Sequence, residues 1–336
     1  MGNGRRAALA GFGRVAELAH APALRENGVE VAAVAEAEPE RRAAAARAFP
    51  DAALYADLDA LLAAEKGLDF VDIATPPFLH GRQALSVLKS GCSVLCEKPL
   101  ALSESEFDAL AAEAARAERV LWCVHNWAHA PQWRKIHELA ASGGLGRLAE
   151  IEIQVLRTAP AAAAGPENWR RDPAKSGGGI LIDHGWHNLY LIYRTLAPRE
   201  RDLKPRLRVE RVAGAPGAED EIALSLDFDR TRARLFLSWR ALGRANRATL
   251  RFERVALELE DDVLCASGAL RDEFRFPEKL SQSSAHPAWF SGSLGDFLAA
   301  LEEPGSGAAR ENLDEAGFCA RIIAAAYALR REALAG

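Results

Sequence analysis

The sequence has neither an excess of positive charge nor a paired set of cysteines. Its 42 lysines and arginines are outnumbered by 47 aspartates and glutamates, which gives a formal net charge of -5. Because nucleic-acid-binding domains usually carry a basic surface, we expect no nucleic-acid partner. The five cysteines are scattered and form no zinc-like pairing with histidines. We therefore expect reduced, mostly buried thiols in a cytoplasmic protein, and no metal site.

Long apolar runs are also absent. No stretch approaches the roughly 18 apolar residues that a membrane-spanning helix needs. Arg5 and Arg6 precede only a short apolar run, residues 7–10, which is too short for a signal peptide. The expectation is a soluble, cytoplasmic protein that has no membrane partner.

A chain of 336 residues exceeds what one hydrophobic core usually supports, so two domains are expected. In the first part, short apolar runs typical of buried strands alternate with segments of helical spacing. This alternation predicts a doubly wound parallel sheet, a dinucleotide-binding Rossmann domain, over residues 1–125. The predicted strands are 7–11, 29–35, 70–74, 94–96 and 120–124, and the predicted helices are 15–27, 39–49, 58–64, 79–90 and 104–118.

The pattern changes after about residue 125. Several segments now alternate apolar and polar residues with period two, as strands with one solvated face do. Runs of strands beside segregated helices predict an α+β domain over residues 126–336, built on an open, mostly antiparallel sheet. The predicted strands are 148–157, 207–212, 221–228, 232–239, 248–252, 255–259 and 269–274, and the predicted helices are 131–141, 188–196, 289–302 and 314–334.

A glycine-rich turn joins the first predicted strand to the first predicted helix. Gly11, Gly13 and Ala16 fit the dinucleotide-binding fingerprint G-x-G-x-x-[GA]. Gly11 permits the tight turn, Gly13 lets the backbone approach a pyrophosphate, and Ala16 allows close packing of helix on sheet. The first helical amides then receive the phosphates. The candidate cofactor residues here are Gly11, Phe12, Gly13, Arg14 and Val15.

Glu36 ends the second predicted strand, twenty residues after Ala16. A carboxylate at this place accepts hydrogen bonds from ribose hydroxyls and repels a 2′-phosphate, which favours NAD over NADP as the cofactor. The alternative is a solvated glutamate, with Arg41 and Arg42 holding the phosphate of NADP instead. NADP therefore stays possible.

Two further segments end predicted strands at the edge where a nucleotide-binding sheet meets its ligand. Thr75 and Pro76 follow strand 70–74, and His80, close behind, either caps the next helix or contacts the cofactor. Glu97 and Lys98 follow strand 94–96. Removing a hydride from an alcohol needs a proton acceptor and a group that stabilises alkoxide charge, and Lys98 can serve electrostatically.

These segments together resemble the Gfo/Idh/MocA family, named after glucose-fructose oxidoreductase and inositol dehydrogenase. The resemblance extends to the run 176–187, in which glycines precede Asp183 and His187 in a D-x-G-x-H pattern, and to the segment 168–170. It implies a nicotinamide-dependent oxidoreductase with catalytic Lys98, His187 and Asp183. It also implies cofactor contacts by Thr75, Pro76, His80, Glu97 and Lys98, and substrate contacts by Lys98, Asn126, Trp169, Arg170, Asp183 and His187.

The chain departs from the family pattern at two places. Tyr190 stands where the family often has an aspartate, three residues beyond the motif histidine. Asn126, Trp127 and His129 stand near Pro131, where the family often has an arginine before a proline. Both changes put a specific sugar substrate in doubt, and Trp127 and His129 either shape the pocket or are simply packed.

The function that the resemblance implies is hydride transfer between a nicotinamide cofactor and a secondary alcohol or ketone of a sugar, cyclitol or related polyol. Two alternatives are a glycoside hydrolase that uses transient oxidation on a held NAD, and a non-catalytic regulator that binds NAD(P). The family uses the open sheet for self-association, so a homodimer or homotetramer is expected.

Overall fold

The computed structural model describes residues 4–161, 169, 172–200, 203–215, 218–282 and 285–335. Two compact units can be separated, and each is described by itself. The first contains the described chain up to Asn126 together with Ala285–Ala320, and the second contains the described chain from Trp127 to residue 282 and from Arg321 onward. None of the helices in these ranges has the length and apolar character that a membrane crossing requires.

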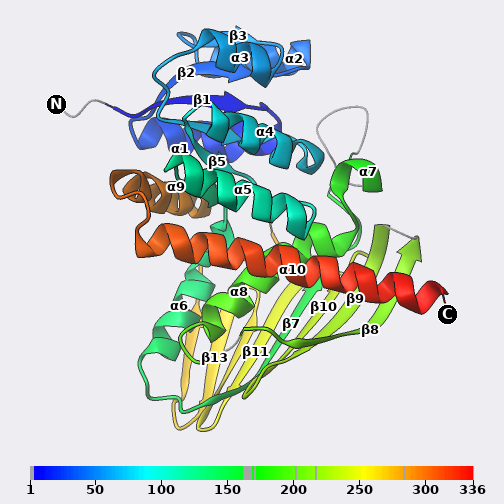
Figure 1. Ribbon diagram of the computed structural model, residues 1–336. Coiled ribbons are helices and arrows are strands. Elements are labelled where there is room, and N and C mark those ends of the chain that lie inside the picture. The colour runs from blue at the N-terminus through cyan, green and yellow to red at the C-terminus, as the bar shows by residue number, and fades with distance from the viewer. Residues whose placement is uncertain are drawn as a thin grey trace. The chain divides into compact units, whose positions relative to one another are not determined.

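The first unit is built on a six-stranded sheet in the order β3-β2-β1-β4-β5-β6 (Figure 1). Every neighbouring pair runs parallel, which confirms the predicted doubly wound Rossmann sheet. The short strand β3 was not predicted: it has only three residues, and its central Leu54 is exposed. The strands are β1 (Arg6–Ala10), β2 (Glu30–Ala35), β3 (Ala53–Tyr55), β4 (Phe70–Ile73), β5 (Ser93–Cys96) and β6 (Leu121–Cys123).

The helices of this unit begin and end near their predicted residues, except that the last helix begins at Gly307 rather than at residue 314. Ser103 caps α5 by accepting the Glu106 N–H at 3.1 Å, and the Glu106 side chain accepts the Leu102 N–H at 2.7 Å. These reciprocal contacts satisfy amides that a helix start leaves unpaired. The elements are the π-helical turn η1 (Ala16–His20), α1 (Ala21–Glu26), α2 (Pro39–Ala48), α3 (Leu58–Ala64), α4 (Pro77–Lys89), α5 (Glu104–Ala117), α9 (Pro287–Glu302) and α10 (Gly307–Ala335), whose later part lies in the second unit.

Helix α9 belongs to the core of this first sheet, although it follows the second sheet in the sequence. Phe290, Phe297 and Leu294 share a buried cluster with strand residues of sheet one. The rings of Phe297 and Phe70 meet edge to face at 5.0 Å between centroids. The division of the chain at residue 125 into two domains stays a prediction, and α9 shows that sequence order alone does not assign every helix to its layer.

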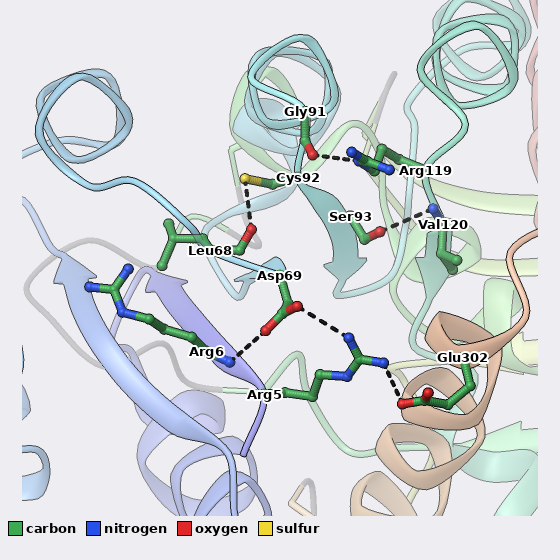
Figure 2. Close-up of polar contacts among 10 residues, drawn as sticks. All are labelled: Arg5, Arg6, Leu68, Asp69, Gly91, Cys92, Ser93, Arg119, Val120 and Glu302. Atoms are coloured by element: carbon green, nitrogen blue, oxygen red, sulfur yellow. Dashed lines mark hydrogen bonds and ion pairs between the residues drawn. The ribbon is translucent and has the colours of Figure 1, made fainter. Parts of the chain in front are cut away.

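The amino ends of the strands are joined by side-chain contacts (Figure 2). Asp69, just before β4, accepts the Arg6 N–H at 2.7 Å and an Arg5 guanidinium N–H at 3.1 Å. Arg5 also pairs with Glu302 at the end of α9. Ser93 at the start of β5 accepts the Val120 N–H at 3.1 Å. These contacts tie the amino edge together, and in this type of fold the ligand binds at the opposite, carboxyl edge.

The second unit is built on an eight-stranded sheet in the order β14-β13-β12-β11-β7-β10-β9-β8 (Figure 1). Only the β7–β10 pair is parallel, which confirms the predicted mostly antiparallel sheet. The strand predicted over 269–274 begins too early, because residues 269–271 lie between two strands, and the strand over 263–268 was not predicted. The strands are β7 (Leu148–Leu156), β8 (Arg206–Ala215), β9 (Ala218–Asp227), β10 (Arg232–Ser238), β11 (Ala245–Phe252), β12 (Val255–Glu260), β13 (Val263–Gly268) and β14 (Asp272–Arg275).

The two faces of this sheet differ in polarity. Along β7, Ile151, Ile153 and Val155 are buried, while Glu150 points to the other face and pairs with Arg234 at 2.7 Å. The strand alternation that predicted a half-solvated sheet is therefore confirmed. The helical elements of the unit are η2 (Asn126–His129), which begins at the unit boundary, α6 (Pro131–Ala141), α7 (Pro173–Ser176), the π-helical turn η4 (Leu181–Gly185) and α8 (Trp186–Leu196).

All five cysteines are free thiols, and Cys92, Cys96, Cys123 and Cys319 are buried, as predicted. Cys92 donates its thiol hydrogen to the Leu68 carbonyl at 3.4 Å. These thiols therefore serve as small core residues.

Candidate functional site

The glycine turn after β1 has the geometry that its residues predict. Gly11 has φ 87°, and a Cβ there would lie 2.9 Å from Thr75 Cγ2, so only glycine fits. A Cβ on Gly13 would meet nothing within 4 Å, so the backbone is open on that side. Ala16 is fully buried at the start of η1. An open glycine backbone at a helix start fits the pyrophosphate of a dinucleotide.

Glu36 lies at this turn, where the sequence places it. Its Oε2 accepts the Phe12 N–H at 2.6 Å, and its Oε1 accepts the Glu38 N–H at 2.9 Å. Arg41 Nε donates to the Phe12 carbonyl at 2.8 Å, and Arg42 donates to the Glu36 carbonyl. The carboxylate that would meet a ribose is therefore fixed by backbone amides, and both arginines hold backbone carbonyls of the same region.

His80 ties the segment after β4 to the segment after β5. The ring is 1% exposed, and its Nε2 and Nδ1 each lie 2.7 Å from a carbonyl oxygen, of Thr75 and of Pro99 respectively. Thr75 donates its hydroxyl hydrogen to Gln83 at 2.6 Å. Burial lowers the pKa of His80, and the two carbonyl contacts oppose that shift. Cofactor contact by His80, Thr75 and Pro76 stays a prediction, while the geometry shows how His80 fixes both segments.

Lys98 follows β5 directly and is half-buried. Its backbone N–H donates to Glu97 Oε2 at 3.1 Å, and a cis peptide bond joins it to Pro99. Glu97 is itself tied to the sheet, because its N–H donates to the Ile73 carbonyl at 2.8 Å. The lysine backbone is thus held at the carboxyl edge of the sheet, the edge where this fold binds its ligand.

Behind Glu97 lies a buried cluster that the sequence analysis missed. His20 Nε2 lies 3.2 Å from Glu97 Oε1, and His20 Nδ1 lies 2.8 Å from Asp72 Oδ2. His20 and Asp72 are both 0% exposed. Phe290 of α9 stacks on the His20 ring at 3.7 Å between centroids. A carboxylate inside the otherwise apolar strand β4 was the available signal, because a buried charge needs a partner.

The charges of this cluster depend on one another. Burial alone would lower the pKa of His20, but the charge and hydrogen bond of Asp72, joined by those of Glu97, raise it to about 9. Burial raises the pKa of Asp72, against the opposing effect of His20. The pKa of Glu97 is lowered, because the contacts with His20 and Lys98 outweigh its burial. The contacts with the two carboxyl groups therefore favour the imidazolium form of His20 at neutral pH.

In the second unit, the glycine run before Asp183 packs against β9. A Cβ on Gly179 would lie 2.1 Å from the Glu219 carbonyl oxygen, so no larger residue fits. The fully buried Glu219 side chain accepts the Leu181 N–H and the Tyr327 hydroxyl hydrogen, both at 3.0 Å. Arg330 pairs with the same carboxylate at 3.2 Å. Two residues of α10 thereby fix the start of η4, the turn that carries Asp183.

His187, in the first turn of α8, is held by two aromatic residues. Trp127 stacks on its ring at 4.9 Å between centroids, with 15° between the planes. The Tyr190 hydroxyl lies 3.2 Å from His187 Nδ1 and accepts the Trp127 N–H at 2.9 Å. All three side chains are buried. The departure from the family pattern at Tyr190 thus places a neutral hydroxyl, rather than a carboxylate, against the histidine.

Asp183 and His184 follow one another on η4, and Asp183 Oδ2 lies 3.7 Å from His184 Nε2. The charge of Asp183 also acts on Arg157, a buried guanidinium after β7 that donates to Asn246 Oδ1 at 3.2 Å. Burial, reinforced by Arg244, lowers the pKa of Arg157 to about 10, and Asp261 and Asp183 oppose that shift. Asp183 therefore lies in a polar region with cationic neighbours within its own unit.

The remaining predicted substrate residues are Asn126, Trp169 and Arg170. Asn126 has a buried side-chain oxygen that accepts no hydrogen bond within the described ranges, and its contact with substrate stays a prediction. Trp169 is half-buried, and Arg170 lies outside the described residues. His129, whose role the sequence left open, is half-buried at the end of η2. Across the described part of the chain, no group of three histidines, cysteines or carboxylates could hold a metal ion.

Comparison with known proteins gives relatives for both parts of the chain. The D-glucoside 3-dehydrogenase of Escherichia coli strain K12 is 30% identical over 187 residues, which are 55% of this chain and 52% of that protein. The levoglucosan dehydrogenase of Pseudarthrobacter phenanthrenivorans is 30% identical over 168 residues, 50% of this chain and 42% of that protein. The chain spans about half the length of the curated relatives it matches.

Among solved structures, GenD2 from gentamicin A biosynthesis, in complex with NAD, has a TM-score of 0.80. It is 24% identical, and the match covers 99% of this chain and 96% of GenD2, so the likeness shows the shared fold. Residues 5–125 match the oxidoreductase family with an NAD-binding Rossmann fold, and residues 133–258 match the GFO/IDH/MocA C-terminal domain. Because these matches cover most of both parts, the chain belongs to the Gfo/Idh/MocA family of oxidoreductases.

Proposed function

We propose that this protein catalyses the reversible, NAD-dependent oxidation of a secondary alcohol on a sugar, cyclitol or related polyol. One observation carries the proposal: the two family-motif residues proposed to act on the substrate hydroxyl, Lys98 and His187, are each fixed by specific contacts. The relatives named as glucoside and levoglucosan dehydrogenases support the substrate class.

Bound NAD supplies the acceptor for the hydride. As the hydride leaves the alcohol carbon, the hydroxyl proton must pass to a base within about 3 Å. We assign that proton to the His187 ring, which Trp127 and Tyr190 hold in place. The Lys98 ammonium stabilises the developing alkoxide charge, and Asp183 supports the site electrostatically. In the reverse reaction the same groups return the proton to the carbonyl oxygen.

Replacement of the two residues tests the assignment. Lys98→Ala and His187→Ala should each lower kcat by about 10²–10⁴-fold, the scale of a lost proton-transfer group, and leave NAD binding within a few fold. His137→Ala is a matched control, because His137 also lies beside a tryptophan, Trp133, and contacts a hydroxyl, that of Thr195, at 3.2 Å. Near-normal turnover in both variants, or joint loss of folding and cofactor binding, would contradict the assignment.

The measured product distinguishes this activity from its alternatives. A dehydrogenase accumulates reduced cofactor in proportion to the substrate oxidised. Glycoside hydrolysis through transient oxidation would release the aglycone without net NADH, and a regulator would show neither. A screen of polyols and glycosides with NAD, followed at the absorbance of NADH and by sugar analysis, separates the three outcomes.

The preference for NAD over NADP is assigned to Glu36. Its carboxylate, fixed at the Phe12 and Glu38 amides, would repel a 2′-phosphate. Thermal shifts at matched ionic strength should be larger with NAD than with NADP, and Glu36→Ala should reduce the difference. A larger shift with NADP that Glu36→Ala leaves unchanged would show that Glu36 does not select the cofactor.

We also propose that the protein works in the cytoplasm as a homodimer or homotetramer associated through its second sheet. The outward face of that sheet carries a net of ion pairs, such as Arg234–Glu150 at 2.7 Å and Arg247–Glu260 at 2.8 Å. Charges arranged in this way can pair with a second copy across a symmetric interface. Light scattering at working concentration should show a dimer or tetramer, and a monomer would refute the proposal.

A further inference from the structure

The cluster of His20, Asp72 and Glu97 contains three ionisable groups for which the proposed reaction has no use. All three come from different elements: His20 ends η1, Asp72 lies within β4, and Glu97 follows β5. Burying His20 and Asp72 fully, and Glu97 in large part, costs free energy unless the groups are mutually paired. Their arrangement therefore calls for a reason other than packing.

The distances fit a doubly protonated His20 ring between two ionised carboxylates. Each nitrogen of the His20 ring lies within hydrogen-bond distance of a different carboxylate, 2.8 Å from Asp72 and 3.2 Å from Glu97. An ionised carboxylate can only accept, so both ring nitrogens must donate, which only the imidazolium can do. The imidazolium also separates two buried negative charges that would otherwise repel each other.

The cluster does not provide a route for protons to solvent. His20 and Asp72 are both fully buried, and within the described chain Asp72 Oδ1 has no hydrogen-bond partner. The chain of hydrogen bonds from Glu97 therefore ends inside the core. Phe290 closes the remaining face of the His20 ring at 3.7 Å. A closed, charged cluster of this kind can hold a group in place, but it cannot exchange protons rapidly.

The two oxygens of Glu97 connect this cluster to Lys98. Oε1 faces His20 Nε2, and Oε2 accepts the Lys98 backbone N–H at 3.1 Å. The rotation of the Glu97 carboxylate, and with it the acceptor for Lys98, is set by the histidine. The cluster and Lys98 together carry two negative and two positive charges, so the lysine charge is balanced within the same group of residues. His20 also lies on the turn that follows the cofactor-binding glycines.

We propose that His20 is a positioning residue for Lys98: by donating to both Asp72 and Glu97 it fixes the Glu97 carboxylate that holds the Lys98 backbone. The proposal rests on the catalytic role of Lys98 proposed above. It assigns to His20 no contact with substrate or cofactor.

A double-mutant cycle tests the coupling. His20→Gln, which keeps a polar side chain but loses the charge and the second donor, should lower kcat by about 10–100-fold and change NAD affinity less than threefold. In a Lys98→Ala background the same change should lower the remaining single-turnover rate less than twofold. If Lys98→Ala alone turns over normally, the proposed function fails, and that result is distinct from failure of the coupling.

Two further measurements do not depend on His20→Gln folding well. With ¹⁵N-labelled histidine, the His20 ring should show two protonated nitrogens at pH 7 in the cofactor-free protein. Asp72→Asn keeps an oxygen opposite Nδ1 but removes its charge. Its kcat, relative to wild type, should fall as the pH rises from 6 to 9, because the imidazolium loses a counter-charge. Glu315→Gln is the matched control, since Glu315 is a buried carboxylate 2.8 Å from His125.

The proposal is overturned by any of three results. The first is an equal loss of rate from His20→Gln in the presence and absence of Lys98. The second is a fall in NAD affinity that matches the fall in kcat, which a merely structural role predicts. The third is a neutral His20 ring at pH 7, or a relative rate for Asp72→Asn that is as independent of pH as that of Glu315→Gln.

Discussion

Lys98 and His187 are supported in opposite ways. Behind Lys98 lies a buried ionic cluster, in which His20 separates the carboxylates of Asp72 and Glu97. The contacts described for His187 are with uncharged groups, the ring of Trp127 and the hydroxyl of Tyr190. Each support is buried within its own unit, and each uses side chains from elements distant in sequence. The described contacts of the first support are between charged groups, and those of the second are with neutral groups.

The difference matches what each group must do in the proposed reaction. Lys98 acts through a fixed positive charge, and a balanced ionic cluster keeps its backbone in one place. His187 must gain and lose a proton, so a charged neighbour would favour one state over the other. The Tyr190 hydroxyl can donate a hydrogen bond to His187 Nδ1 or accept one from it, which holds the ring in both states. An ionic support suits Lys98, whose charge stays constant, and a neutral hydroxyl suits His187, whose protonation changes during the reaction.

The largest expected effect comes from breaking the ionic support. His20→Leu leaves Asp72 and Glu97 buried without their cation, which should lower the free energy of unfolding by about 3–5 kcal/mol. Urea denaturation measures this loss. The double variant His20→Leu with Asp72→Leu removes one of the stranded charges and should lose less. A double variant less stable than His20→Leu would show that the unpaired charges are not the main cause of the lost stability.

The second largest effect should come from a change of pH, which affects the ionic support of Lys98. The pKa of His20 is raised from 6.5 to about 9 in the folded protein, so its contribution to stability is complete below pH 6.5 and is lost as the pH rises through 9. The stability difference between wild type and His20→Gln should therefore shrink by about 3 kcal/mol between pH 6 and pH 10. Denaturation curves at both pH values measure it. A stability difference that grows with pH would contradict the claim that His20 is protonated in the folded protein.

Tyr190 provides the corresponding test of the uncharged support. Tyr190→Phe removes the acceptor of the Trp127 N–H and the partner of His187 Nδ1, which should cost about 1–3 kcal/mol of stability. We expect kcat to fall about tenfold, because the ring loses its orientation. Tyr190→Asp should instead raise the pH below which activity falls, because a carboxylate stabilises the protonated histidine. Identical pH profiles for wild type and Tyr190→Asp would remove the distinction between the two supports.

Local patterns in the sequence predicted the parts of the site that depend on local structure. The glycine turn and Glu36 were predicted correctly in place, because strand and helix periods are visible within a few residues. Strand β13 was not predicted, and the strand predicted over 269–274 began three residues before β14. Short-range spacing therefore fixed the order of elements better than their ends.

The supports themselves could not be predicted, because their contacts join distant residues. His20 resembles any residue on the buried face of a helix until Asp72 and Phe290 are placed beside it. Tyr190 was recognised as a departure from the family pattern, but its contact with the Trp127 backbone became visible only in the fold. The predicted catalytic roles of Lys98, Asp183 and His187 remain predictions that the kinetic tests address.

The smallest effect should come from Trp127, because stacking is weaker than the loss of a hydrogen-bonded or charged partner. Trp127→Phe keeps an aromatic face toward His187 and leaves the backbone N–H free to donate to Tyr190, so only part of the ring contact is lost. We expect a loss of about 1 kcal/mol in stability and a decrease in kcat of roughly threefold. Trp127→Ala should cost more in both measurements, since it removes the face altogether. If Trp127→Phe instead lowers kcat as strongly as Tyr190→Phe does, the indole itself takes part in binding substrate, and the support of His187 is no longer separable from the substrate site.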